Sequence, residues 1–294
     1  MMVHLSEALF PLISLIMLGA VLGRTTDFFD GSALSGLVTT VGIPALLLHS
    51  VLGMDMDIAG MGGLVGITVV WLVVMSAITA LMLSAAGLPV RTYLPALVHP
   101  NTGNMGIPVC FALFGAQSLG LATVISSVIQ VSHFTLGIGC LSGRLSLGAM
   151  LKNGPVLALL AGAVLLAAEV SLPGPVMTTL DMLGSITIPV MLMLLGSSIA
   201  SLKLSGVRDM IRPMAFSLYR PLAGLALAWL LLMVWPLTEM EAQVFLIQCA
   251  MPVAVMSYVL AVRYKGPAQE VALTIPMSLL VSLVVVVLFF AVSV

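Results

Sequence analysis

The chain has 294 residues, of which 61% are hydrophobic and only 7% are charged, and its mean hydropathy is +1.25. A soluble domain carries about 25% charged residues, so this chain cannot cover itself with a polar surface and belongs in a lipid bilayer. Its formal net charge of −1 excludes nucleic acid as a natural partner.

The cysteines and the N-terminal segment indicate neither a disulfide or metal site nor a cleaved signal peptide. Cys110, Cys140 and Cys249 lie in apolar runs without metal-ligand spacing, so we expect small buried residues rather than disulfides or a metal site. No cofactor is expected either. The first residues, MMVHLSEALFPLISLIMLGAVLG, lack the basic start and the cleavage site of a signal peptide, which predicts a retained first helix.

Apolar runs long enough to cross a bilayer recur along the whole chain. A spanning helix needs about 20 predominantly apolar residues. Ten such runs occur, at residues 5–23, 31–52, 61–86, 92–116, 118–140, 152–170, 174–200, 211–235, 240–262 and 268–293. The sequence therefore predicts an all-α polytopic membrane protein with ten transmembrane helices and no soluble domain.

The basic residues predict the orientation of these helices. Nine of the ten lie in odd-numbered connections, namely Arg24, Arg91, Arg144, Lys152, Lys203, Arg208, Arg212, Arg263 and Lys265. Cytoplasmic loops carry the excess of Lys and Arg, so the odd connections are expected in the cytoplasm and both termini outside it. The predicted location is the cell membrane, in bacteria the inner membrane.

Three pairs of prolines indicate an internal repeat. Pro11 and Pro155 are 144 residues apart, Pro44 and Pro189 are 145 apart, and Pro108 and Pro252 are 144 apart. The chain is thus predicted to consist of a first five-helix repeat, 1–147, and a second, 148–294. Because each has an odd number of spans, the second is inverted, which is the plan of many secondary transporters.

The stretch HPNTGNMGIP, residues 99–108, interrupts the fourth span. Pro100 removes a helical N–H and disfavours helical geometry at His99, while Gly103 and Gly106 are expected to let the chain run extended. Pro108 then suits the first turn of a new half-helix, with Asn104 or a neighbour as its cap. The ninth span has the same break at Met251–Pro252.

Two broken helices that cross near the membrane midplane would present the N-termini of two half-helices to each other. Free N–H groups and a partial positive charge there suit a carboxylate or another anionic group. The candidate substrate-binding residues share a place in or near a break: Asn101, Thr102, Gly103, Asn104, Gly106, Pro108, Gln130, Gln248, Met251 and Pro252. For Gln130 and Gln248 an alternative stays open, which is a hydrogen bond to a neighbouring helix.

Other polar residues at membrane depth have weaker cases. His99 and His133 are candidates for proton coupling, of which His99 is favoured, and His49, near the outer end of the second span, is the weakest of the histidines. Arg220 lies inside the eighth span, where it either steers an anion or extends back to the cytoplasmic face. No carboxylate adjoins either break, which favours an anionic cargo over a cation. Sodium held by carbonyls and amides stays open.

Four segments resemble the auxin efflux carrier family in its prokaryotic, malate or malonate permease-like branch, over essentially the whole chain. They are NTGNMGIPVCFALFG, GPVLALLAGAVL, SITIPVMLMLLGSSIA and AMPVAVMSYVLAVRYKG. The resemblance implies a fold similar to bile-acid symporters, with crossed broken helices 4 and 9. It also implies an elevator movement of a transport domain, spans 3–5 and 8–10, against a scaffold, spans 1–2 and 6–7, through which relatives form homodimers.

The expected function is transport of a small organic anion, such as malonate, malate or an auxin-like acid, by secondary active or facilitative alternating access. The fifth connection, about residues 141–151, lacks the long loop of many plant carriers, so no loop regulation is implied. An anion channel, or a sodium- or proton-coupled carrier of another solute, is the alternative. The breaks hold no catalytic constellation, so the chain is not expected to be an enzyme.

Overall fold

The computed structural model describes residues 2–26, 31–53, 62–115, 117–143, 154–201 and 208–293. Within these ranges the regular structure is helical, which confirms the predicted all-α class. The five predicted spans of the first half contain, in order, α1 (Met2–Thr25); α2 (Gly31–Leu37), the π-helical turn η1 (Val38–Gly42) and α3 (Ile43–Leu52); α4 (Gly62–Ala85); α5 (Val90–Val98), the π-helical turn η3 (Thr102–Gly106) and α6 (Ile107–Phe114); and α7 (Gln117–Ser132), the π-helical turn η4 (His133–Gly137) and α8 (Ile138–Ser142). The five predicted spans of the second half contain, in order, α10 (Gly154–Ala167); α11 (Gly174–Ser185) and α12 (Thr187–Ser201); α13 (Arg208–Leu232); α14 (Glu239–Cys249) and α15 (Val255–Arg263); and α16 (Ala268–Ser293).

Several of these helices have the length and apolar surface of membrane spans. Among the described residues, five helical stretches are long and apolar enough to cross a bilayer: Gly62–Ala85, Gly120–Ser142, Gly174–Ser197, Arg208–Leu232 and Ala268–Leu288. Large apolar side chains such as Leu81, Val164 and Leu280 point outward and are exposed. Exposed apolar surface of this kind indicates contact with lipid.

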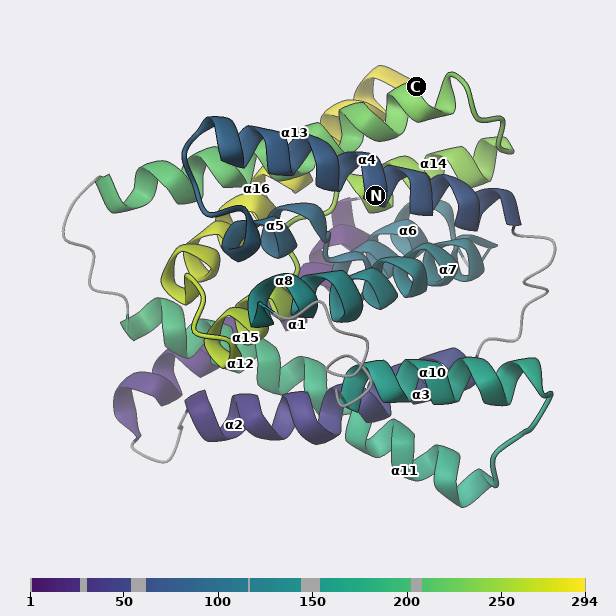
Figure 1. Ribbon diagram of the computed structural model, residues 1–294, viewed down its shortest axis with the longest axis vertical. Helices are drawn as coiled ribbons and strands as arrows, with labels where there is room; N and C mark the ends of the chain where they lie inside the picture. The colour runs from purple at the N-terminus through teal and green to yellow at the C-terminus, as the bar shows by residue number, and fades with distance from the viewer. Residues whose placement is uncertain are drawn as a thin grey trace.

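The helices pack in two groups. The first group consists of α1, α2–α3, α10 and α11–α12, in which α1 packs along α12 and α3 packs against α10 and α11. The second group consists of α4 to α8 and α13 to α16, in which α13 contacts α4, α14 and α16. Figure 1 shows α2, α3, α10 and α11 together below α4, α13 and α14. Several contacts within one half of the chain have a counterpart in the other half: α4 contacts α5 and α7, just as α13 contacts α14 and α16.

Two glycines bring α1 and α12 into backbone contact. A Cβ atom on Gly19 would collide with the backbone of Met193, and a Cβ atom on Gly196 would collide with the carbonyl group of Ile16. Small residues at such positions let membrane helices approach closely and gain van der Waals contact. The first helix group is therefore held together by tight backbone packing.

Two described odd-numbered connections lie at one end of the helix bundle, and two even-numbered ones lie at the other. In Figure 1 the connections 86–89 and 264–267 lie at its left, and 168–173 and 233–238 lie at its right. At the first end, the guanidinium group of Arg24 donates to the carbonyl oxygen of Ala200 at 3.1 and 3.2 Å. Arg212 pairs with Glu270 at 3.4 Å, and Arg91 and Lys265 line one shallow hollow. Apart from Arg220, the basic residues that the structure describes are thus concentrated at this end of the helix bundle.

Candidate functional site

The two proline breaks pair with each other. In the first, residues 99–101 separate α5 from η3, and in the second, residues 250–254 separate α14 from α15. Pro100 and Val253 form an isolated antiparallel bridge. The N–H of Asn101 donates to the carbonyl oxygen of Pro252 at 2.8 Å, and the N–H of Ala254 donates to that of His99 at 3.3 Å. Since lipid cannot satisfy backbone polar groups, the breaks stabilise each other.

The interruption of the fourth span covers only the first residues of the stretch 99–108 that the sequence predicts to interrupt it. His99 adopts extended geometry, with φ −90° and ψ 112°, as expected for a residue before proline. The prediction that Gly103 and Gly106 run extended is wrong, because both lie in the helical turn η3, which continues directly into α6. Nor does Asn104 cap a new helix start at Pro108: no side chain caps either segment.

Gly106 is needed for close packing against a side chain and not for an extended backbone. A Cβ atom there would collide with the side-chain amide of Gln248. Gln248 is fully buried, and its Nε2 donates to the carbonyl oxygen of Ala122 at 3.3 Å. Of the two predicted roles of Gln248, the structure therefore shows the hydrogen bond to a neighbouring helix. Gln248 does not line the cavity described below.

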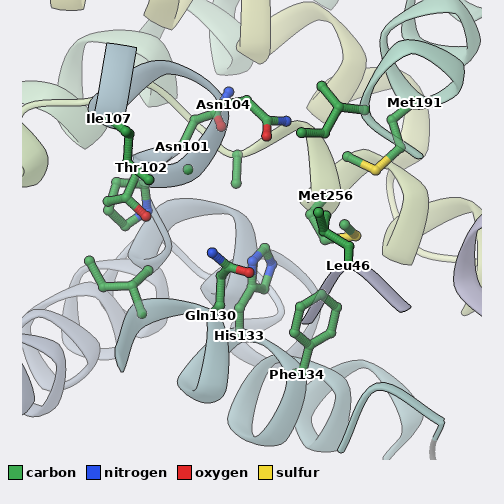
Figure 2. Close-up of a pocket in the computed structure, with 15 residues that line it drawn as sticks. Leu46, Asn101, Thr102, Asn104, Ile107, Gln130, His133, Phe134, Met191 and Met256 are labelled. Carbon is green, nitrogen blue, oxygen red and sulfur yellow. The ribbon is translucent and has the colours of Figure 1, made fainter. Parts of the chain in front are cut away.

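A cavity of about 180 Å³ lies beside the paired breaks. Its polar wall comes from Asn101, Thr102, Gly103 and Asn104 of the first break, and from Gln130 and His133 of α7 and η4. Figure 2 shows Asn101 and Asn104 on one side of the cavity, with Gln130 and His133 facing them from the opposite side. Five of the predicted binding residues and one histidine are thus brought together.

Helix ends supply further hydrogen-bond donors. The first turn of α15 begins at the cavity, where Ala254 and Met256 are wall residues. No side chain caps this turn, and the first N–H groups of a helix have no partner within it. Among the residues that line the cavity there is no carboxylate. The wall therefore offers amides and backbone donors without a fixed negative charge.

A small polar network sets the orientation of two wall residues. The hydroxyl group of Thr102 donates to Oγ of Ser126 at 3.1 Å, and Nε2 of Gln130 donates to the same oxygen at 2.9 Å. Ser126 was not predicted from the sequence, although it lies one helical turn before Gln130 and so shares its face of α7.

The remaining wall is apolar, and part of it comes from the first helix group. Leu46 from α3, with Ile188 and Met191 from α12, lines the cavity, and Figure 2 shows Leu46 and Met191 near Met256. Leu46 and Met191 each follow one member of the proline pair Pro44 and Pro189 by two residues. They therefore occupy matching positions of the predicted repeats, a signal that the sequence contained.

The other predicted residues lie outside the cavity. Met251 is buried in the second helix group, and the carbonyl oxygen of Pro252 accepts the hydrogen bond from Asn101 that joins the breaks. Pro108 lies in the first turn of α6. His99 lies behind the wall against His133, and His49 faces Asp181 at 4.0 Å.

One of the two interpretations of Arg220, that its side chain extends back to the cytoplasmic face, is wrong. It is fully buried, its guanidinium carbon lies 5.3 Å from the ring centre of Trp71, and its Nη1 donates to the carbonyl oxygen of Cys249 at 3.2 Å. Cys249 ends α14, where carbonyl groups carry a partial negative charge. Arg220 thus interacts with the end of a half-helix and does not line the cavity.

Comparison with known proteins identifies the family of this chain. The sequence model of a family described as membrane transport protein matches the chain in two stretches, residues 4–146 and 141–290. An uncharacterized transporter from Methanocaldococcus jannaschii is 26% identical over 200 residues, which cover 64% of each chain. The match therefore spans somewhat less than two thirds of that relative. The chain belongs to the membrane transport protein family, to which the auxin efflux carriers also belong.

Proposed function

We propose that this protein is a secondary carrier of a small organic anion, such as a mono- or dicarboxylate, rather than a channel or an enzyme. One observation carries the proposal: the cavity beside the two paired breaks is lined by side-chain amides and by the start of α15, with no carboxylate among its wall residues. Such donors stabilise a negative group. A cation in the same place would lack a counter-charge.

The size of the cavity favours a small solute. Its volume of about 180 Å³ is below the roughly 300–1,000 Å³ of pockets that hold drug-sized ligands. The amides of Asn101 and Asn104 on one side, and Gln130 on the other, are placed to donate to one or two carboxylates. The apolar residues Met191 and Met256 would cover the carbon part of the solute.

The position of the cavity between the two helix groups supports an elevator movement. In this proposal the first helix group, spans 1–2 and 6–7, is a scaffold that also forms a homodimer. The second group, spans 3–5 and 8–10, carries the solute across the membrane. The side of the cavity on the first group is apolar, with Leu46, Ile188 and Met191. Because apolar side chains make few directional bonds, the second group could slide along this side of the cavity without breaking many of them.

The membrane arrangement belongs to the same proposal. Two inverted repeats, 1–147 and 148–294, would form ten spans, with the basic end of the bundle in the cytoplasm and both termini outside. The reciprocal helix contacts of the two halves support this arrangement, as does the matching placement of Leu46 and Met191.

Uptake into proteoliposomes tests the function. Purified protein would be reconstituted and supplied with radiolabelled mono- and dicarboxylates, with and without pH and sodium gradients. We expect saturable uptake of at least one anion, and exchange against the same unlabelled anion inside. Anion currents without counterflow exchange would show a channel. Uptake of organic cations instead of anions would overturn the proposal.

A further inference from the structure

Two histidines, one in the first break and one in η4, stack at the polar wall of the cavity. The rings of His99 and His133 are parallel within 2°, and their centres are 4.3 Å apart. Each residue is only 3% exposed. His133 lines the cavity, while His99 lies in the first break and follows the end of α5. The pair therefore connects the solute site to the broken backbone.

Hydrogen bonds determine the protonation of His99. Its Nδ1 lies 2.8 Å from the carbonyl oxygen of Pro95, which can only accept, so Nδ1 carries the proton. In the neutral ring Nε2 then accepts from the hydroxyl group of Ser132 at 3.0 Å. Both nitrogens of His99 are occupied by neutral partners, which fixes the ring in place.

His133 has a more open arrangement. Its Nε2 lies 3.3 Å from Oγ of Ser257, a hydroxyl group that can donate or accept. The ring can therefore be neutral or protonated without losing this bond. Figure 2 shows the imidazole of His133 beside Gln130, on the cavity side of η4. Of the two histidines, His133 is the one that a solute in the cavity can reach.

Few other ionisable groups surround the pair. Of the elements packed against α5 and η4, α13 supplies Tyr219 and Arg220, α15 supplies Tyr258, and α8 supplies Cys140. The described parts of α4, α7 and α10 contain none. The ionisable residues Arg91, Tyr93, Arg208, Asp209, Arg212 and Arg263 lie toward the basic end of these helices.

This environment opposes a positive charge on the pair while the cavity is empty. Burial disfavours an imidazolium ion, and Arg220 adds a positive field at His99. Two positive rings at 4.3 Å would also repel each other, so the pair can hold at most one proton beyond those of the two neutral rings. An anion in the cavity would supply the missing counter-charge next to His133.

We propose that the anion binds together with one proton, which the imidazole of His133 takes from water, and that His99 acts as a positioning residue. This inference rests on the proposed anion transport and assigns its coupling ion. Linkage is reciprocal: the anion promotes protonation of His133, and a low pH promotes binding of the anion. A pH gradient would then drive net movement of the anion.

Proton uptake during binding tests the inference. The probes are lactate, malate and indole-3-acetate, titrated calorimetrically into the full-length protein at about pH 7.5 and 8.5, in buffers of different ionisation enthalpy. Carboxyl groups have pKa values near 4, so these probes stay ionised throughout. We expect uptake of about one proton per anion and a Kd that rises up to about tenfold between the two pH values.

Three variants locate the proton. His133→Gln keeps a side chain that can bond Ser257 but cannot take a proton, so its Kd should not change with pH. His99→Gln retains the donor to Pro95 and should still take up a proton. His49→Gln changes a histidine that is not part of the cavity wall, so it is the matched control and should behave like the wild type. If His133→Gln does not fold, His133→Asn replaces it.

The outcomes separate this inference from the proposed function. Anion binding without proton uptake in the wild type would overturn the coupling and leave the anion site intact. Proton uptake that persists in His133→Gln, or that is lost only in His99→Gln, would overturn the assignment to His133. If no probe binds to the wild type at either pH, the proposed function fails, and the coupling fails with it.

Discussion

The backbone N–H of Asn101 donates a 2.8 Å hydrogen bond to the carbonyl oxygen of Pro252, which joins the two breaks of the chain. Pro100 and Pro252 each remove a donor from a helix. The backbone groups freed by one break are partly satisfied by the other, so neither break would be stable alone in lipid. The cavity proposed as the solute site lies beside these paired breaks.

A negative charge in the cavity should abolish anion binding. Asn104→Asp would place a carboxylate among the donors of the wall and repel the solute, while folding is retained. Asn104→Ala should weaken binding by about 1–3 kcal/mol, the usual cost of losing a hydrogen bond to a charged group. Thermal-shift or scintillation-proximity assays on monodisperse protein would measure both effects.

The control for this prediction adds the same charge elsewhere. Gln117→Glu introduces a carboxylate at an exposed position at the start of α7, and binding should be unchanged. Wild-type anion affinity in Asn104→Asp would show that Asn104 is structural. A gain of affinity for a cation would show that the sign of the cargo is wrong.

Gly106 and Gln248 should be energetically coupled. In Gly106→Ala the new Cβ atom meets the buried amide of Gln248, which has little room to move, so stability should fall. Gln248→Ala removes the obstacle, and the double variant should lose less than the sum of the two single ones, by about 0.5–3 kcal/mol. Thermal melting in detergent would measure the coupling.

Gly103→Ala serves as the matched comparison for stability. Its Cβ atom would lie at ordinary contact distances, 3.4 Å from Oγ of Ser126 and 3.5 Å from Nε2 of Gln130. This variant should melt close to the wild type. Additive losses in the Gly106 and Gln248 variants would refute the predicted collision.

The contact between α1 and α12 should depend on Gly196. The Cβ atom of Gly196→Ala overlaps the carbonyl group of Ile16, so the helices must separate, at a cost of about 1–3 kcal/mol typical of overpacking. Gly62→Ala makes the same chemical change in α4 where no atom lies within 4 Å. A lower melting temperature only in Gly196→Ala is expected, and equal effects would argue against the close approach.

Site-directed labelling should reveal the orientation in the membrane. In a background with Cys110, Cys140 and Cys249 replaced, a cysteine at Thr26 or Gly206 should react only from the cytoplasm. Cysteines at Pro173 and Thr238 should react only from outside. These positions fall in odd and even connections, which the distribution of basic residues separates. The reverse pattern would contradict both the orientation and the inverted repeat.

The sequence alone was sufficient for the features that depend on local chemistry. Apolar runs predicted where the helices lie, because a chain with so few charges must bury its backbone groups in helices when it lies in lipid. Pro100 and Pro252 predicted both breaks, because proline removes a backbone donor wherever it stands. The four-residue segment from Asn101 to Asn104 was likewise predicted as part of the site, and it lines the cavity.

Only the tertiary structure decided which side chains meet. Gln130 and Gln248 are both amides near a break, yet Gln130 lines the cavity and Gln248 packs against Gly106. His99 in the first break and His133 in η4 are stacked although they lie 34 residues apart in the sequence, and Arg220 contacts the end of α14 instead of the membrane surface. The direction of each side chain depends on the rotation of its helix against its neighbours, and that rotation is set by long-range packing which spacing in the sequence does not encode.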